Sequence, residues 1–454
     1  MNTHSPTRRQ WIVLVSLFVL SLPAVTPRIY SSDEIQYFAY LRSLWFDRDL
    51  SFENEYRYFY DRGVARSDGF HETFLELRTD AGRRINFGTI GCAILWSPFY
   101  AVGDLAARAT GAPRDGFSTP YLAAIAYGSA VYGWLALVLA IRCAGRLGYN
   151  GFVGALAVWL GTPLAFYMYV APPFSHACSA FAVALFTWMW LRVRDQWTPA
   201  GMAALGAAGA LMVMVREQDV FFGAAAAVDF GVWALGFGPW TGGGSRSLKP
   251  KVQSVVTAAI AFVVVYAPQL AAYEIVNGHF GPHASVSNKM HWWSPHIFQV
   301  MFDPQHGYFV WTPLALLAIV GLGMLATRSR KGAILLLMVA LQFYIGGSVE
   351  SWTVAGGFGQ RRLVSISAAL VIGYSCLWSL AQARAARTAL VAVTLIAVYW
   401  NLALTAEFAT GLMDRQTLEP RRNAYDAFVT LPRMAPSLAY RYVFDRSSFY
   451  KPRS

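Results

Sequence analysis

Hydrophobic residues occur along this chain in blocks of about 17–24 residues, separated by short polar segments. Blocks of this kind differ from the pattern of an amphipathic helix in a soluble protein, in which apolar residues recur with a period of about 3.6 along one face. Their length matches the roughly 20 residues that a helix needs to cross ~30 Å of hydrocarbon. The pattern predicts about eleven transmembrane helices, at residues 10–30, 120–141, 151–171, 175–193, 199–215, 221–239, 253–275, 308–327, 331–348, 364–383 and 387–408.

Positive charge is distributed unequally between the two sets of loops that these helices define. One set carries twelve basic residues, Arg142, Arg146, Arg192, Arg194, Arg246, Lys249, Lys251, Arg328, Arg330, Lys331, Arg384 and Arg387. The opposite set, before the C-terminal tail, carries Arg216, Lys289, Arg361 and Arg362. Because cytoplasmic loops are enriched in Lys and Arg, the first set is predicted to be cytoplasmic. Arg8 and Arg9 predict a cytoplasmic N-terminus as well.

One further apolar stretch, 88–108, is interrupted by three glycines, Pro98 and Asp104. An even number of crossings must separate the N-terminus from Arg142 if both are cytoplasmic. The helices at 10–30 and 120–141 supply two crossings, and a third would break this parity. We therefore expect residues 88–108 to form a half-buried or membrane-surface helix within an external loop.

The expected fold class is an all-α polytopic membrane protein with a large first external loop that carries interfacial helices. The predicted parts are a first transmembrane helix (1–30), a first external loop with an acidic motif (31–119), a core transmembrane bundle (120–275), a second external loop (276–307), C-terminal transmembrane helices (308–408) and an external C-terminal tail (409–454). The expected location is the inner or plasma membrane.

Composition agrees with this class, since 56% of residues are hydrophobic and 14% are charged, against roughly 25% charged in soluble domains. The net charge of +12 does not indicate nucleic acid, because many of the basic residues lie at helix ends, where they orient spans and meet anionic lipid. The four cysteines lie in or beside apolar segments without close spacing, and are expected to be unpaired.

An acidic pair, Asp33 and Glu34, follows the first predicted helix within a few residues of the membrane surface. Carboxylates at such a position risk desolvation, and are therefore candidates for function. The alternative is a solvated helix cap, with Ser32 or Asp33 as the N-cap and Glu34 in the first turn. The aromatic and charged segment that follows suits amphipathic helices on the membrane surface.

Four later segments share the predicted external side with the acidic pair. They are the stretch 86–100, which begins Asn-Phe-Gly; the segments 277–282 and 303–313, which are rich in His, Gly and Pro; and the Gly-rich segment 356–363. In this order, the motifs resemble the GT-C superfamily of membrane glycosyltransferases. The branch they resemble most contains protein O-mannosyltransferases and the aminoarabinose transferase of lipid A.

The resemblance implies an enzyme that moves a sugar from a polyprenyl phosphate to an acceptor hydroxyl with inversion. The hydroxyl needs a carboxylate to take its proton, and Asp33 matches the first acidic position of the family. Asp33 is therefore the predicted base, with Glu34 as a helper or an alternative base. The phosphate leaving group needs stabilisation by basic side chains, and we predict Arg216, Arg361, Arg362 and, as a weaker candidate, Lys289.

Five residues are predicted to bind substrate: Tyr37, His176, Gln218, His279 and His306. The last two belong to a histidine-rich loop, but its spacings lack a known zinc frame. A divalent cation held by Asp33 or Glu34 would have suitable oxygen ligands, and some relatives use one whereas others do not. The resemblance therefore implies no certain cofactor and leaves the metal undecided.

The predicted partners are a polyprenyl-phosphate-linked sugar, an acceptor glycan, lipid or protein, and the bilayer. The alternative function is a transporter or flippase of a lipid-linked glycan. Such a protein should have paired charges within its spans and inverted repeats. Here the predicted span interiors contain few charges, Asp229 and Glu407 being exceptions, which favours the enzyme.

Overall fold

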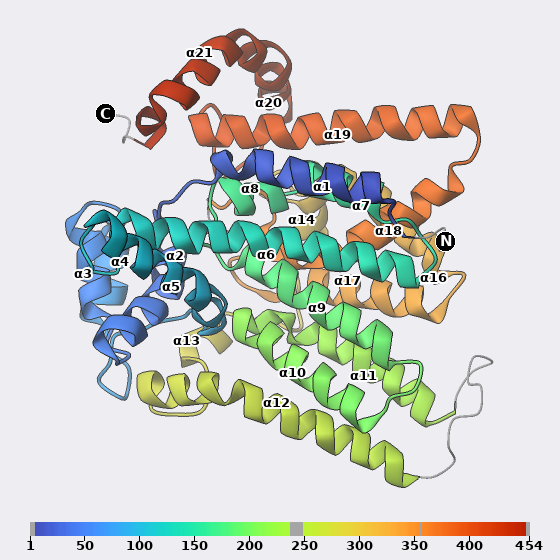
Figure 1. The fold of residues 1–454 in the computed structure, drawn as a ribbon, viewed down its shortest axis with the longest axis horizontal. Coiled ribbons are helices and arrows are strands. Elements are labelled where there is room, and N and C mark those ends of the chain that lie inside the picture. The colour runs from blue at the N-terminus through green and yellow to red at the C-terminus, as the bar shows by residue number, and fades with distance from the viewer. Residues whose placement is uncertain (1–4, 237–247, 355, 451–454) are drawn as a thin grey trace.

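The computed structural model describes residues 5–236, 248–354 and 356–450. Within these ranges the chain is helical, and its only extended pairings are two isolated bridges, Arg78 with Arg84 and Met290 with Val349. Figure 1 shows long helices side by side along the longest axis, with α12 and α19 at opposite edges of the bundle and the short helices α2–α4 gathered at one end.

The α-helices are α1 Arg8–Ser21, α2 Ser32–Arg42, α3 Glu53–Asp61, α4 Asp68–Phe70, α5 Gly91–Thr110, α6 Thr119–Arg146, α7 Phe152–Gly161, α8 Leu164–Tyr169, α9 His176–Val193, α10 Pro199–Val215, α11 Val220–Ala234, α12 Leu248–Asn277, α13 Ala284–Ser287, α14 Ile297–Phe302, α15 Tyr308–Trp311, α16 Leu314–Ala326, α17 Arg330–Ser348, α18 Ser367–Leu380, α19 Arg384–Thr410, α20 Pro420–Tyr425 and α21 Leu431–Phe444. Two short 3₁₀ segments, η4 (Glu217–Asp219) and η5 (Arg361–Ile366), join α10 to α11 and precede α18.

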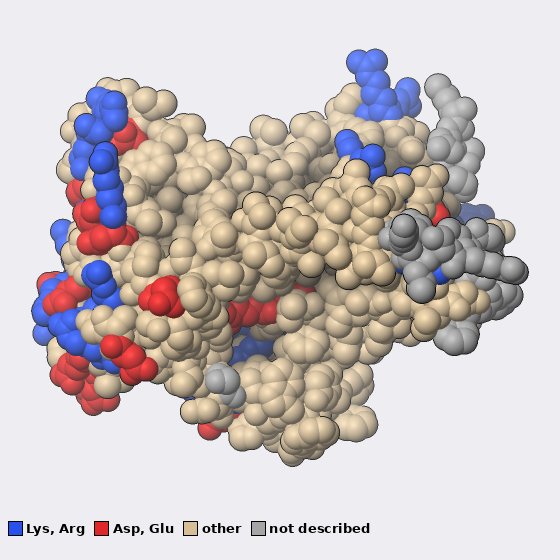
Figure 2. Space-filling model, turned by 90° about the horizontal axis from the view of Figure 1, so that it is seen from below, with Lys and Arg blue, Asp and Glu red and all other residues tan. Residues whose placement is uncertain are grey.

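Among the described residues, six helices are long and apolar enough to cross a membrane: Thr119–Arg146, His176–Val193, Lys251–Asn277, Arg330–Ser348, Arg361–Leu380 and Arg384–Thr410. Three shorter apolar helices, α7, α10 and α16, accompany them. Figure 2 shows charged side chains mainly toward the two ends of the long axis, with a largely uncharged surface between them that a few acidic and basic side chains interrupt near the middle of that face. The chain is thus a multi-pass membrane protein, whereas the total of eleven spans stays a prediction.

Two of the predicted spans are broken by a Thr-Pro pair. The stretch 151–171 divides into α7 and α8 at Thr162, and the stretch 308–327 divides into α15 and α16 at Thr312. Proline disfavours the helical conformation of the residue before it, and Thr162 is extended (φ −135°, ψ 165°). Asn401 of α19 donates to the carbonyls of Leu160 (2.9 Å) and Thr162 (3.1 Å), so that carbonyls freed by the break keep partners.

The ambiguous stretch 88–108 corresponds to α5, and both ends of this helix pack tightly on neighbouring helix ends. A Cβ on Gly91 would lie 2.4 Å from the backbone of Met214, at the end of α10. A Cβ on Gly103 would lie 2.9 Å from the carbonyl oxygen of Pro120, in the first turn of α6. The predicted topology has both of these neighbouring ends on the same, external side, and the packing of α5 agrees with a helix that does not cross, which stays a prediction.

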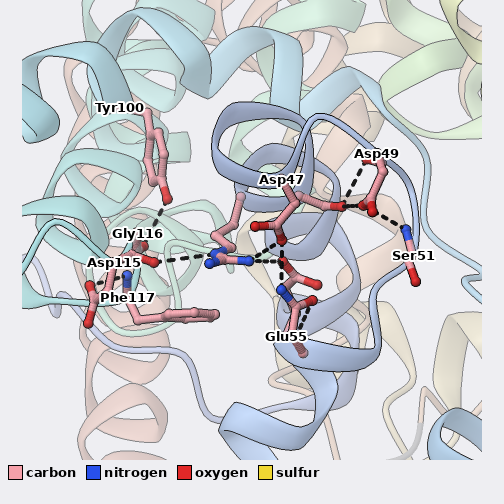
Figure 3. Close-up of polar contacts among 11 residues, drawn as sticks. Asp47, Asp49, Ser51, Glu55, Tyr100, Asp115, Gly116 and Phe117 are labelled. Carbon is pink, nitrogen blue, oxygen red and sulfur yellow. Dashed lines mark hydrogen bonds and ion pairs between the residues drawn. The ribbon is translucent and has the colours of Figure 1, made fainter.

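Arg42, the last residue of α2, joins the segments at this end of the molecule. Its guanidinium forms ion pairs with Asp47 and with the buried Glu55 (2.9 Å), and donates to the carbonyl of Asp115 (3.3 Å). It also lies over the ring of Phe117, 4.7 Å from the centroid. Figure 3 shows these partners converging from α3 and from the loop before α6, so Arg42 fixes the end of α2 against both.

A second ionic cluster lies at the ends of α9, α11 and α17 that are predicted to be cytoplasmic. The buried carboxylate of Asp229 pairs with Arg194 (2.8 Å) and Arg330 (2.7 Å). Glu407, the other carboxylate predicted inside a span, accepts a hydrogen bond from Asn423 (2.6 Å). Both carboxylates thus hold helices together within the protein.

The topology predicts that a cysteine at Thr110, which is exposed at the end of α5, reacts with an impermeant maleimide added outside the cell. The measurement uses a background in which the four cysteines, all buried, are replaced. A cysteine at Gln196, in the predicted cytoplasmic loop after α9, is the control and should react only after permeabilisation. If the cysteine at Thr110 also reacted only after permeabilisation, α5 would cross the membrane.

Candidate functional site

A cavity of about 440 Å³ lies where α2, the turn between α10 and α11, the loop after α13, the end of α17 and η5 meet. Eight of the eleven predicted site residues line it: Asp33, Tyr37, His176, Arg216, Gln218, Lys289, Arg361 and Arg362. Four aromatic side chains, Phe87, Phe174, Phe221 and Trp292, contribute apolar wall. The cavity therefore combines several charges with the apolar surface that is typical of small-molecule sites.

Asp33 lies in the first turn of α2 and forms an ion pair with Arg361. The Nη1 of Arg361 lies 2.7 Å from Oδ2 of Asp33, and the aspartate side chain stays 40% exposed. The guanidinium also lies over the ring of Phe174, 5.2 Å from its centroid. A Cβ on Gly357 would lie 2.8 Å from Cδ of Arg361, so this glycine leaves the space that the arginine needs.

Arg216 ends α10 in an extended conformation (φ −153°, ψ 119°) that directs the chain into η4. Its Nη1 lies 3.1 Å from Nδ1 of His176. Because a guanidinium can only donate, Nδ1 of His176 accepts this hydrogen bond and its ring is neutral. The imidazole is 3% exposed and stacks on Phe174, so it positions Arg216 without competing for an anion.

Arg362 and Lys289 complete the basic lining from the two external segments nearest α17. Arg362 donates to the carbonyl (2.7 Å) and the hydroxyl (3.1 Å) of Ser351. Gln218 donates in turn to the carbonyl of Arg362 (3.3 Å). Lys289 has its Nζ 5.8 Å from the ring centroid of Phe87 and no ion pair with a described carboxylate, and its carbonyl accepts from the amide of Glu350 (2.8 Å).

Two further carboxylates lie next to Arg216. Burial raises the pKa of Asp219 to about 6, against the lowering effect of Arg216, and Ser179 donates to its carboxylate (2.6 Å). Burial also raises the pKa of Glu217, which lines the cavity, to about 7. With three guanidiniums and one ammonium against these carboxylates, the cavity favours an anionic ligand.

Glu34 does not line the cavity. Ser31, one residue before the expected caps, is the N-cap of α2, and Glu34 completes a capping box with it. Oε2 of Glu34 accepts from the backbone amides of Tyr30 (2.8 Å) and Ser31 (3.0 Å). Burial raises its pKa to about 8, so its carboxyl group is mainly protonated at neutral pH. Its position supports the capping interpretation and not the role of helper or alternative base.

His279 and His306 also lie outside the cavity lining. His279 is exposed in the loop after α12. His306 is buried, stacks on Trp311 (4.8 Å between centroids), and its Nε2 donates to the carbonyl of Gly357 (2.8 Å). It thus supports the turn that leads to Arg361 and contacts no ligand space. No three His, Cys, Asp or Glu side chains cluster as metal ligands in the described part of the chain.

Glu217 and Ser351 are among the polar residues of the cavity lining that the sequence motifs did not identify. Glu217 lies between two predicted residues, Arg216 and Gln218, and this charged turn between apolar helices was a signal that could have included it. Ser351 has no such signal, because its role depends on where Arg362 lies in space.

No family model matches this sequence, and no curated protein matches it. Among solved structures, the chain is similar to the crystal structure of ArnT from Cupriavidus metallidurans bound to undecaprenyl phosphate. The TM-score is 0.52 with 12% sequence identity, over 93% of this chain and 75% of that chain. The apo structure of the same protein gives a TM-score of 0.49 with 12% identity, over 92% of this chain and 74% of that chain. The similarity shows that this chain shares the fold of that ArnT structure, which agrees with the fold expected from the sequence.

The two carboxyl groups at the start of α2 should respond differently to substitution. Glu34→Gln should leave the melting temperature and the activity near wild type, because an amide replaces a carboxyl that is mainly neutral. Glu34→Ala removes the cap and should lower stability by about 1 kcal/mol, as measured by thermal unfolding. A large loss of activity in folded Glu34→Gln would show instead that Glu34 takes part in the reaction.

Proposed function

We propose that this protein transfers a sugar from a polyprenyl phosphate to an acceptor hydroxyl, with inversion at the anomeric carbon. The observation that carries the proposal is the arrangement of Asp33, Arg216, Arg361 and Arg362 around one cavity. One carboxylate and several guanidiniums are the minimum set that this reaction requires. The similar ArnT structure is described as bound to undecaprenyl phosphate, which supports a lipid phosphate as donor.

Asp33 acts as the base in this proposal. The acceptor oxygen attacks the anomeric carbon, its proton passes to the carboxylate of Asp33, and the bond between the anomeric carbon and the phosphate oxygen breaks. Arg361 orients the carboxylate through the 2.7 Å ion pair. Because the Asp33 side chain stays 40% exposed, the acceptor hydroxyl can reach it from the cavity.

The guanidiniums hold the phosphate of the donor and stabilise the leaving group. A phosphodiester carries one negative charge, and the departing monoester gains more as the glycosidic bond breaks. Arg216, Arg361 and Arg362 provide forked donors that can bind two phosphate oxygens at once. The neutral partners of Arg216 and Arg362, His176 and Ser351, leave their positive charges available to an anion.

The loop charges support a location of this cavity on the external face of the inner or plasma membrane, with the N-terminus in the cytoplasm. A lipid-linked donor would reach such a site from the bilayer with its phosphate at the membrane surface. Transport of a lipid-linked glycan is less well supported, because Asp229 and Glu407 both have partners within the protein. In the proposed enzyme, the charged side chains of the cavity bind the donor at the membrane surface and do not line a path through the spans.

Incubation of purified protein with a panel of polyprenyl-phosphate sugars and candidate acceptors tests the proposal. We expect release of polyprenyl phosphate with at least one donor, and formation of the glycosylated acceptor. Movement of intact lipid-linked sugar across reconstituted vesicles, without cleavage of any donor, would favour the transporter.

Asp33→Asn should lower turnover by roughly 100- to 10,000-fold, because the amide cannot accept the proton. The melting temperature should stay near wild type, since the side chain is partly exposed and contributes little packing. Asp61→Asn, an exposed carboxylate at the end of α3, is the matched control and should retain activity. Near-normal turnover of Asp33→Asn would remove Asp33 from the role of base.

Alanine at Arg216, Arg361 or Arg362 should lower turnover more than donor affinity, because the leaving phosphate gains charge in the transition state. The expected loss is on the order of 100-fold for each. Lysine should restore only part of the rate, because an ammonium cannot form the two-pronged contact. Arg66→Ala, in the exposed part of the first loop, serves as the control. Normal turnover in all three alanine variants would contradict the phosphate-donor mechanism.

A further inference from the structure

Glu217 is a second acidic side chain of the cavity, and the proposed reaction does not use it. It follows Arg216 directly in the turn between α10 and α11 and lines the same space as the guanidiniums. The described residues give its carboxylate no hydrogen bond and no ion pair, although Asp33 has an ion pair with Arg361 and Asp219 a hydrogen bond from Ser179. An acidic side chain without a partner is thus held at a cavity that is otherwise basic.

The position of Glu217 carries an energetic cost. Burial raises its pKa to about 7, and no basic group contributes to that shift. A partly buried carboxylate without a hydrogen-bond partner is unfavourable, because the surrounding protein does not replace its lost water. A carboxylate with a structural role is expected to have a hydrogen-bond or ion-pair partner in the protein. A carboxylate that binds a ligand keeps its oxygen atoms available for that ligand.

The wall near Glu217 suits a sugar ring. Phe87, Phe221 and Tyr37 line the cavity together with Glu217 and Gln218. The C–H faces of a sugar are apolar and pack on aromatic rings, whereas its hydroxyl groups donate hydrogen bonds to carboxylate and amide oxygens. Hydrogen bonds to an ionised acceptor are stronger than those between neutral groups.

We propose that Glu217 is a specificity residue that accepts hydrogen bonds from hydroxyl groups of the transferred sugar. The proposal rests on the proposed function, because it assumes that a sugar phosphate occupies the cavity. It divides the cavity into a phosphate part, lined by Arg216, Arg361 and Arg362, and a sugar part that begins at Glu217. A lipid phosphate without sugar would then bind through the arginines alone.

Binding measurements separate the two parts. Undecaprenyl phosphate and the undecaprenyl phosphates of glucose, mannose, galactose and arabinose are titrated into the purified full-length protein and its Glu217→Gln and Glu217→Ala variants. Wild type should discriminate among the sugars. For the sugar that it binds best, both variants should lose roughly 10- to 100-fold in affinity. Their affinity for undecaprenyl phosphate should stay within about twofold of wild type, because this lipid has no sugar for residue 217 to contact.

Thermal unfolding distinguishes this role from a structural one. At pH 8, Glu217→Gln should melt at the same temperature as wild type or higher, because it removes a poorly solvated charge. The matched control, Glu72→Gln on the exposed first loop, should change neither binding nor melting. A melting temperature of Glu217→Gln well below that of wild type would show that the carboxylate stabilises the fold, and would contradict the proposed role in sugar binding.

Each remaining outcome overturns one proposal or the other. Equal affinity of wild type for all five lipids, or an equal loss for undecaprenyl phosphate and its sugar forms in Glu217→Gln, would exclude Glu217 as a specific sugar contact without contradicting the proposed function. Failure of wild type to bind any of them more tightly than Arg216→Ala does would overturn the proposed function, and with it this inference.

Discussion

The accumulation of positive charge around one partly buried cavity is the constraint on which the site depends. Arg216, Arg361, Arg362 and Lys289 converge there, and in a region of reduced dielectric their mutual repulsion is stronger than in water. Asp33 pairs with one of these groups, whereas His176 and Ser351 provide neutral partners. An anion with several oxygens would relieve the repulsion, and the phosphate of the proposed donor is an anion of this kind.

The scaffold delivers these side chains from helix ends rather than from span interiors. The N-cap of α2 orients Asp33, and the extended residue that ends α10 turns the chain so that Arg216 and Glu217 line the cavity. Segments that are distant in sequence hold these ends in place. Thr89 donates to the carbonyl of Val215 (3.0 Å), and His306 holds the turn before Arg361. Helix ends of this kind allow polar backbone and charged side chains to meet a ligand at the membrane surface.

Local patterns in the sequence predicted the fold class and eight of the residues that line the cavity, and the failures of these patterns share one physical cause. Apolar block length predicts helices well, yet it does not predict the breaks at Thr162 and Thr312, which persist because distant groups such as Asn401 satisfy the backbone. Glu34 and His306 have the residue types of an active site, but their neighbours in space direct them into a cap and a turn. Glu217 was missed because the feature that sets it apart is visible only in three dimensions. Its carboxylate has no hydrogen-bond or ion-pair partner among the described residues.

The most direct test of the central claim is an experimental structure of the protein in lipid nanodiscs with bound undecaprenyl phosphate. The account predicts that the phosphate lies in the cavity, within hydrogen-bonding distance of at least two of Arg216, Arg361 and Arg362, with the polyprenyl chain leaving toward the bilayer. A headgroup bound elsewhere, or a cavity that excludes the phosphate while the three guanidiniums contact other protein groups, would contradict it.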